Sequence, residues 1–147
     1  MNFKTPLHEF HLLCKAKMVD FAGWEMPIQY GSLTNEYEAV REKAGIFDVS
    51  HMGRLFVSGP DAAKDIDKVV VSRIQDLKPG QARYTVVCNP EGGCKDDILV
   101  SCLAPESYFI VVNASNREKI VSWFKENFSN STEMKDKTLE TGMIAIQ

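Results

Sequence analysis

The sequence predicts an α+β fold in which helices pack on one face of an antiparallel sheet. Between residues 54 and 124 the apolar patterns run in the order strand, helix, three strands, helix. The turn-rich segment Asn89–Gly93 separates two of these strand patterns, as is typical of a hairpin. A chain of 147 residues with 44% hydrophobic and 25% charged side chains is sufficient for one hydrophobic core under a charged surface.

The first fifty residues are less regular. Thr5 and Pro6 predict a short helix over 5–13, with Thr5 as its cap and Pro6 at the first helical position. Residues 17–27 show no sustained period and predict a strand followed by a loop. Apolar side chains at helical spacing predict a helix over 32–44 that ends at Gly45: Leu33, Tyr37, Val40 and Ala44.

The second part of the chain has a clearer rhythm. A strand over 54–57 precedes Gly59-Pro60-Asp61, which opens a helix with an apolar inner face of Ala62, Ile66, Val69 and Val70. A turn at 78–80 leads into strands over 83–88, 97–102 and 108–112. Further strands are predicted over 138–140 and 143–147.

The helix predicted after the strand over 108–112 shows a sequence signature at its start. Ser115 and Glu118 match a capping box, in which each side chain accepts from the other residue's backbone N–H. The helix that it opens is predicted to bury three side chains: Ile120, Trp123 and Phe124.

Charge and apolar runs exclude several classes of partner. The net charge is −3 and no basic stripe is present, which argues against a nucleic-acid partner. No apolar run approaches the roughly 20 residues that span a bilayer, so no membrane partner is expected. The first residues lack the pattern of a secretory signal or transit peptide, and we therefore predict a soluble, cytoplasmic protein.

The four cysteines show no metal-binding spacing. Cys14, Cys88, Cys94 and Cys102 form no C-x-x-C pair and have no suitably spaced histidine. They are interpreted as reduced core residues, with a disulfide between Cys88 and Cys94 as the alternative.

The segment from Asn89 to Val100 is the most informative. Gly92 and Gly93 permit a tight turn, and the adjacent carboxylates Asp96 and Asp97 follow. Neighbours in a strand point to opposite faces, so one carboxylate is expected on the covered side of the sheet, together with Leu99. Acidic residues often begin a strand after a turn, but a carboxylate at an apolar cleft also suits proton handling or stabilisation of a cation.

A second candidate segment contains Asp48, Ser50 and His51. Residues this close in sequence do not normally form a catalytic triad, and no nucleophile elbow is present. A metal bound by His51 with Asp96 and Asp97 is conceivable, although a lone histidine is more often structural. Tyr84 and Asn113 are unremarkable by local pattern.

Taken together, several segments resemble the opening of the T proteins of the glycine cleavage system. They occur in the family's order and cover essentially the whole chain: T-P-L at 5–7, K-M-V-D-F-A-G-W-E-M-P-I-Q-Y at 17–30, A-V-R at 39–41, A-G-I-F-D-V-S-H-M-G at 44–53, A-R-Y at 82–84, G-G-x-x-D-D at 92–97 and V-V-N-A-x-N at 111–116.

The resemblance implies a tetrahydrofolate-dependent aminomethyltransferase. Such an enzyme takes the aminomethyl group from the lipoyl group of the H protein, releases ammonia and forms 5,10-methylenetetrahydrofolate. By motif position it implies a catalytic role for Asp97, which would lie beside the folate nitrogens. It implies folate contacts by Asp97 and by five further residues: Met52, Tyr84, Leu99, Val111 and Asn113.

The resemblance also implies a domain organisation, with the T-protein fold incomplete at the C-terminus. Residues 1–51 would form the N-terminal part of a discontinuous first domain, 52–135 an α+β domain with the G-G-x-x-D-D hairpin, and 136–147 a segment returning toward the first domain. We expect the full-length protein to be an enzyme and this piece alone to be inactive.

Three alternatives remain open from the sequence. The nearest is a non-catalytic folate-binding relative that assists iron–sulfur protein maturation, and another is the folate-binding half of a sarcosine or dimethylglycine dehydrogenase. A metal-dependent hydrolase using His51, Asp96 and Asp97 is the third, and it predicts a bound divalent metal.

Overall fold

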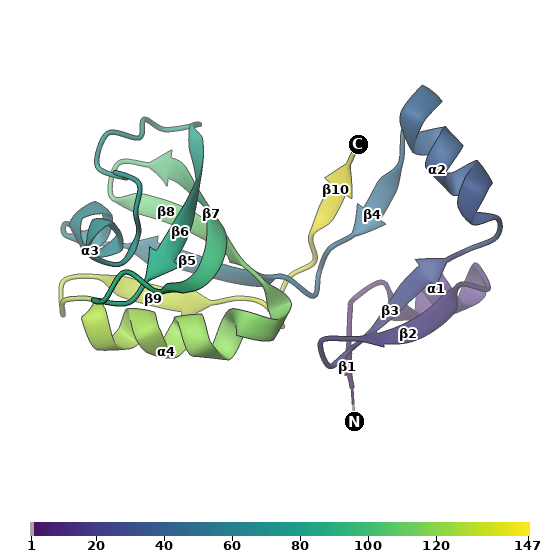
Figure 1. Ribbon diagram of the computed structural model, residues 1–147, viewed down its shortest axis with the longest axis horizontal. Helices are drawn as coiled ribbons and strands as arrows, with labels where there is room; N and C mark the ends of the chain where they lie inside the picture. The colour runs from purple at the N-terminus through teal and green to yellow at the C-terminus, as the bar shows by residue number, and fades with distance from the viewer. Residues whose placement is uncertain (1) are drawn as a thin grey trace. The chain divides into compact units, whose positions relative to one another are not determined.

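The computed structural model describes residues 2–147, which divide into two compact units (Figure 1). Of the described residues, unit 1 comprises 2–51 and Thr138–Gln147, and unit 2 comprises Met52–Lys137. The strand pairs are antiparallel except for one short parallel pair in unit 1, and together with the separate helices they confirm the α+β class. None of the described helices is both long and apolar enough to cross a membrane.

Unit 2 is built on a five-stranded antiparallel sheet with the order β6-β7-β8-β5-β9. Its strands are β5 (Gly53–Ser58), β6 (Ala82–Cys88), β7 (Cys94–Ala104), β8 (Ser107–Val112) and β9 (Glu133–Asp136). The helices are α3 (Ala62–Val69) and α4 (Arg117–Asn127), the latter preceded by the 3-10 turn η1 (Ala114–Asn116). The predicted strand, helix, three strands, helix order is confirmed.

One face of this sheet and the two helices enclose a single core. Every second side chain of β7 and β8 is buried, the period expected of strands covered on one side. The helices contribute apolar side chains to the same cluster, which includes Leu55, Val57, Ala62, Ile66, Val69, Ile98, Val100, Ile110, Ile120 and Phe124. The predicted inner face of α3 is therefore confirmed except at Val70, which is half-buried and forms a bridge to Val87.

The predicted start of α4 is wrong. Ser115 lies inside η1, and the helix begins without a side-chain cap. The side chain of Asn116 instead donates to Asp96, 20 residues earlier in the chain. The residue next to Ser115 is thus bound to a carboxylate from a distant part of the chain, and the local capping box does not form. Trp123 is half-buried rather than buried.

The chain after α4 also differs from expectation. The strand predicted over 138–140 is absent from the described structure, and the strand in this region is β9, which pairs with β5. The sequence of β9 is mostly charged and therefore lacks the apolar alternation that predicts a strand. In the structure its charges are paired: Lys135 with Glu133, and Asp136 with Arg117. The predicted strand over 143–147 is confirmed as β10 (Ile144–Ile146).

Unit 1 contains two small sheets. The first has the order β1-β3-β2, from β1 (Phe3–Lys4), β2 (Lys17–Phe21) and β3 (Trp24–Gln29), and the second pairs β10 with β4 (Ile46–Asp48). Residues 17–27 are therefore mostly paired strand, whereas a loop was expected after the first strand. The turn between β2 and β3 is Ala22-Gly23, and both residues have positive φ. Alanine is not among the residues typical of such a turn, so the sequence pattern did not predict it.

The two helices of unit 1 are shorter than predicted. The first, α1 (His8–Leu13), follows a turn in which the Thr5 hydroxyl accepts from the Leu7 N–H, so Thr5 is not its cap. The second, α2 (Leu33–Glu42), has Ser32 as its N-cap, and Gly45 instead exchanges backbone hydrogen bonds with Gln147.

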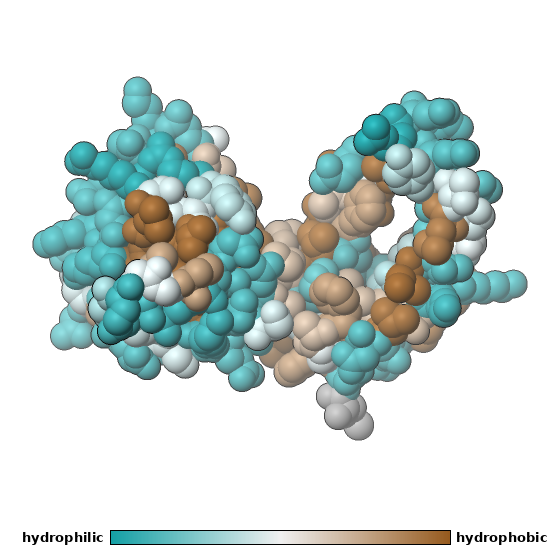
Figure 2. Space-filling model, viewed as in Figure 1, coloured by the Kyte–Doolittle hydropathy of each residue, from teal (hydrophilic) through white to brown (hydrophobic). Residues whose placement is uncertain are grey.

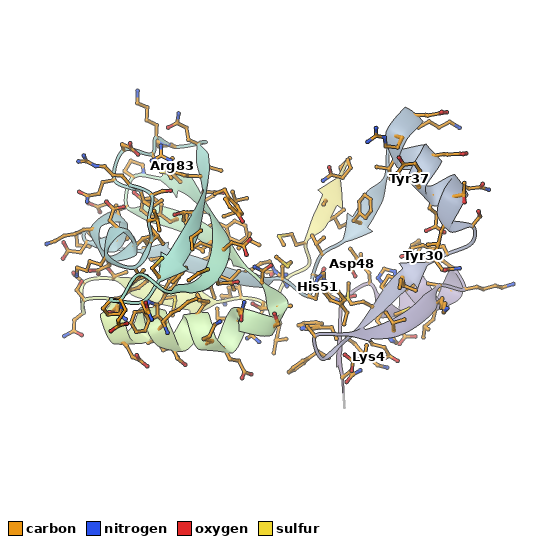
Figure 3. All side chains as sticks on the ribbon, viewed as in Figure 1. Lys4, Tyr30, Tyr37, Asp48, His51 and Arg83 are labelled. Atoms are coloured by element: carbon orange, nitrogen blue, oxygen red, sulfur yellow. The ribbon has the colours of Figure 1, made fainter. Side chains whose placement is uncertain are left out.

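Buried histidines of unit 1 have carboxylate partners. His8 Nε2 lies 2.8 Å from Glu25, and His11 Nε2 lies 2.8 Å from Asp48. Burial would raise the pKa of Asp48, but hydrogen bonds from Ser50, Thr5 and His11 outweigh it and lower that pKa. Tyr30, whose hydroxyl lies 2.7 Å from His11 Nδ1, has a pKa raised by burial and by Asp48 (Figure 3). These two histidines are structural.

All four cysteines are free thiols. Cys102 is buried, as expected of a core cysteine, but Cys14 and Cys94 are exposed and that interpretation is wrong for them. Cys88 and Cys94 are cross-strand partners without a disulfide.

Candidate functional site

The second face of the unit 2 sheet holds the candidate site. We call it the open face, because α3 and α4 cover the other one. Four side chains of the sequence-based site point to it from adjacent strands: Tyr84, Asp97, Leu99 and Val111. Strand pairing places Tyr84 beside Leu99 and Leu99 beside Val111, which makes a row across β6, β7 and β8. Tyr84 is 64% exposed and Leu99 41% exposed, so this row is an accessible apolar surface.

Asp97 lies next to this row with both carboxylate oxygens hydrogen-bonded. The Tyr84 hydroxyl donates to Oδ2 at 2.8 Å, and Asn113 Nδ2 donates to Oδ1 at 3.1 Å. The hydrogen bond to Asp97 is the main reason that the pKa of Tyr84 is raised. The two donors hold an exposed carboxylate in one orientation beside an apolar surface.

The acidic pair divides between the two faces, as expected, but with a different partner on the covered side. Asp96 is buried with Ile98 and Val100, whereas Leu99 lies on the open face with Asp97. The expectation that Leu99 faces the covered side is therefore wrong. Strand period explains it, since residues two apart share a face and Leu99 is two residues from Asp97.

The sequence singled out Asp96 as half of the acidic pair and as a possible metal ligand, but not its hydrogen bonds to Asn113 and Asn116. Asp96 is 4% exposed and accepts three hydrogen bonds: from the Asn113 backbone N–H at 3.3 Å, Asn113 Nδ2 at 2.9 Å and Asn116 Nδ2 at 2.7 Å. Asn113 Nδ2 therefore contacts both carboxylates. The sequence feature that could have indicated these contacts is the pair of asparagines, Asn113 and Asn116, three residues apart directly after an apolar strand.

Met52 occupies the same end of the sheet as Asn113. It directly precedes β5, whose first residue Gly53 pairs with Val112, the last residue of β8. The Met52 carbonyl accepts from Arg54 Nη1 at 2.7 Å, and its side chain is half-buried. The strands of unit 2 thus gather all six sequence-based site residues at one sheet end or on one face.

The arrangement suits a flat, largely apolar ligand on which positive charge develops better than it suits a metal. The side chains of Asp96 and Asp97 lie on opposite faces, and the point where an oxygen of each comes together is taken by the Asn113 amide. Within residues 2–147 no group of three or more metal-binding side chains is found. A fixed anion beside accessible apolar side chains can instead stabilise positive charge that forms on a flat, bound molecule.

A separate hollow lies within unit 1. It measures about 520 Å³, and its lining is largely apolar and includes Ile28, Leu33, Val40, Ile46 and Phe47. The labelled side chains of Tyr30, Tyr37 and Asp48 also line it (Figure 3).

The family model and the similar sequences point to the same kind of protein. The family described as "GCVT N-terminal domain" matches residues 7–147. The chain is 44% identical over 144 residues to an aminomethyltransferase of Halothermothrix orenii, covering 98% of this chain and 40% of the relative. It is 45% identical over 145 residues to an aminomethyltransferase of Thermotoga maritima, with coverage of 98% and 40%.

A solved structure agrees with the sequence relatives. The crystal structure of glycine cleavage system aminomethyltransferase T from Bartonella henselae superposes with a TM-score of 0.94 at 32% identity. The match covers 100% of this chain and 41% of that one. The chain thus spans about two-fifths of the length of the relatives that it matches.

Proposed function

Since the chain belongs to the GCVT N-terminal domain family, we propose that it is the tetrahydrofolate-binding part of an aminomethyltransferase of the glycine cleavage system. The complete enzyme would take an aminomethyl group from the lipoyl sulfur of its partner, the H protein. It would release ammonia and join the one-carbon unit to two nitrogens of tetrahydrofolate as a methylene bridge. The observation that supports this most directly is Asp97, held by Tyr84 and Asn113 beside the apolar row.

The hydrogen bonds of Asp97 support a role in this transfer. A folate nitrogen would bond to the methylene carbon as ammonia leaves. Breaking of the carbon–sulfur bond, which releases the lipoyl thiol, then leaves an iminium-like carbon with positive charge until the second folate nitrogen closes the bridge. A carboxylate already oriented by two donors stabilises that charge without reorganising during the reaction. The same oxygens can accept a proton from the attacking folate nitrogen.

The apolar row has the shape and chemistry for a flat ring. Side chains of Tyr84, Leu99 and Val111 lie on three adjacent strands, whose spacing of about 4.8 Å places the outer two roughly 10 Å apart. That width matches a bicyclic heteroaromatic ring. Met52 and Asn113 lie at the sheet end and would contact the ring's polar edge.

Binding of tetrahydrofolate by the 147-residue chain tests this proposal. Leu99→Ala should weaken binding about 10-fold, because it removes roughly 1–2 kcal/mol of apolar contact. Leu103→Ala is the matched control, since Leu103 lies on the same strand, is 50% exposed and is four positions farther from Asp97. Heteronuclear NMR titration with tetrahydrofolate detects even millimolar affinity.

Shifts should concentrate on β6, β7 and β8 in the titration. Equal affinities of the two leucine variants would contradict this binding surface. If tetrahydrofolate causes no shifts at millimolar concentration in the parent chain, the folate assignment itself fails for this unit.

We further propose that unit 1 is one part of a larger, discontinuous domain. Among the described residues of α2 none is buried, and large apolar side chains are exposed on this unit: Leu33, Tyr37, Ile46, Ile144 and Ile146. Figure 2 shows hydrophobic atoms at its surface. About 60% of the length of the relatives lies outside the matched region, and part of that length would cover the hollow described above.

Hydrogen exchange should separate the two units in this chain. Backbone amides of β7 and β8 are expected to exchange at least about 100-fold more slowly than those of β4 and β10. The reason is that β4 and β10 form a two-stranded sheet, which is marginally stable without further packing. Equal protection in β8 and β10 would show that unit 1 is complete by itself.

A further inference from the structure

We propose that Asp96 is a positioning residue, which turns the side-chain amide of Asn113 so that its oxygen, rather than its nitrogen, faces the ligand on the open face. The inference deepens the proposed function and rests on it for the identity of the ligand. The orientation of Asn113 does not depend on that identity, because the contacts that determine it lie within unit 2.

The hydrogen-bond inventory of Asn113 supports this orientation. Its Nδ2 has two hydrogens and lies within hydrogen-bond distance of Asp96 Oδ1 at 2.9 Å, Asp97 O at 3.1 Å and Asp97 Oδ1 at 3.1 Å. All three are acceptors, so the nitrogen must point at the acidic pair. Among the described residues no hydrogen bond uses Asn113 Oδ1. The oxygen is therefore left as an acceptor for a molecule bound at the site.

Asp96 is the member of this set that fixes the amide most firmly. It is nearly fully buried, and its oxygens accept from both the backbone N–H and the side chain of Asn113. Asn116 Nδ2 donates to the same Oδ1 at 2.7 Å and holds the carboxylate from the other side. A charged acceptor forms stronger hydrogen bonds than a neutral one, and more so where water is excluded. A reversed Asn113 would direct its oxygen at two carboxylates.

The orientation has a consequence for the ligand. An oxygen acceptor beside Asp97 selects a molecule with N–H groups at its edge. A reduced pterin has such N–H groups on its ring and amino substituent. A ligand with acceptors at that edge would oppose both Asn113 Oδ1 and the Asp97 carboxylate. Asp96 would thus determine donor specificity without contacting the ligand.

The replacement Asp96→Asn tests the positioning role. The introduced amide has one oxygen and an NH2 group, so it cannot accept from all three donors and Asn113 is free to reverse. We expect about a 10-fold rise in the dissociation constant of tetrahydrofolate for the 147-residue chain, the value of one hydrogen bond. Asp67→Asn is the matched control, because Asp67 also accepts from a backbone N–H (of Ile74) and a side-chain amide (of Gln75). It should leave the affinity unchanged.

The neighbouring donor separates orientation from a structural role. Asn116→Ala removes a buried hydrogen bond to Asp96 Oδ1 but keeps the carboxylate and both of its contacts with Asn113. The affinity should therefore stay within about 3-fold of the parent value. A loss in folded Asn116→Ala as large as that in Asp96→Asn would show a merely structural effect and overturn the proposal.

The side-chain resonances of Asn113 give a readout without ligand. In the parent chain its NH2 protons should exchange slowly with water, and in Asp96→Asn they should exchange fast. An Asn113 amide with the same exchange rate in both chains would overturn the inference. If the parent chain fails to bind tetrahydrofolate but shows the expected exchange difference, the folate assignment fails while the positioning of Asn113 stands.

Discussion

Replacing Asp97 by asparagine is expected to lower the rate of one-carbon transfer by about 100- to 1,000-fold, the usual effect of removing one preorganised electrostatic group. The side chain is exposed on the open face, and asparagine has almost the same shape. The free energy of unfolding should therefore stay within about 0.5 kcal/mol of the parent value. The loss should appear in kcat, because positive charge forms during the reaction and not on binding.

The measurement needs a protein of full family length that contains this chain. Methylene transfer from the aminomethyl-lipoyl H protein to tetrahydrofolate is measured in parallel with urea unfolding. Asp76→Asn is a suitable control, since Asp76 is also an exposed carboxylate with a partner, Arg83. If the kcat of Asp97→Asn stays within 3-fold of the parent value, the carboxylate has no role in the chemical step and the open face is only a binding surface.

Replacing Asp65 by asparagine is expected to destabilise unit 2 by about 3 kcal/mol, as is typical when one partner of a buried charged network is removed. Asp65 lies on α3, is fully buried and accepts four hydrogen bonds. They come from Lys68 Nζ, the backbone and hydroxyl of Ser129, and the Thr132 hydroxyl, at 2.5 to 2.8 Å. Asparagine turns one acceptor oxygen into a donor facing these donors.

The same carboxylate should make stability depend on acid. Burial alone would raise the pKa of Asp65, but the hydrogen bonds from Lys68, Ser129 and Thr132 outweigh it and hold that pKa far below its ordinary value. The stabilisation is thus fully present above about pH 4, the pKa of an unfolded aspartate, and is lost as the pH falls below it.

Urea unfolding of the 147-residue chain from pH 7 to pH 2 measures both effects, followed on a signal from unit 2. The parent chain should lose stability steadily below pH 4, and Asp65→Asn should show a shallower loss. Asp61→Asn, a neighbouring carboxylate that accepts from the exposed Ser131 hydroxyl, should change stability by less than about 1 kcal/mol. Parallel pH profiles of the parent and Asp65→Asn would contradict the assignment.

Local patterns were sufficient wherever a segment's own side chains decide its structure. The Asn89–Gly93 turn joins β6 and β7 as predicted, and α3 buries the stripe that helical spacing indicated. Patterns failed where a distant partner decides. Ser115 and Glu118 form a valid capping signature, but Asn116 binds Asp96 across the structure. The polar strand β9 exists because β5 offers it a free edge.

By itself, the sequence determined the fold class of this protein, its family and the presence of an acidic pair at the start of an apolar strand. Two-residue periodicity also determined that the pair divides between faces. The order and register of β6, β7 and β8 decided which carboxylate is buried. They also decided that Tyr84 and Asn113 hold the exposed one. The physical reason is that a hydrogen bond between strands depends on which residues pairing places opposite each other, whereas a segment's pattern reports only its own period.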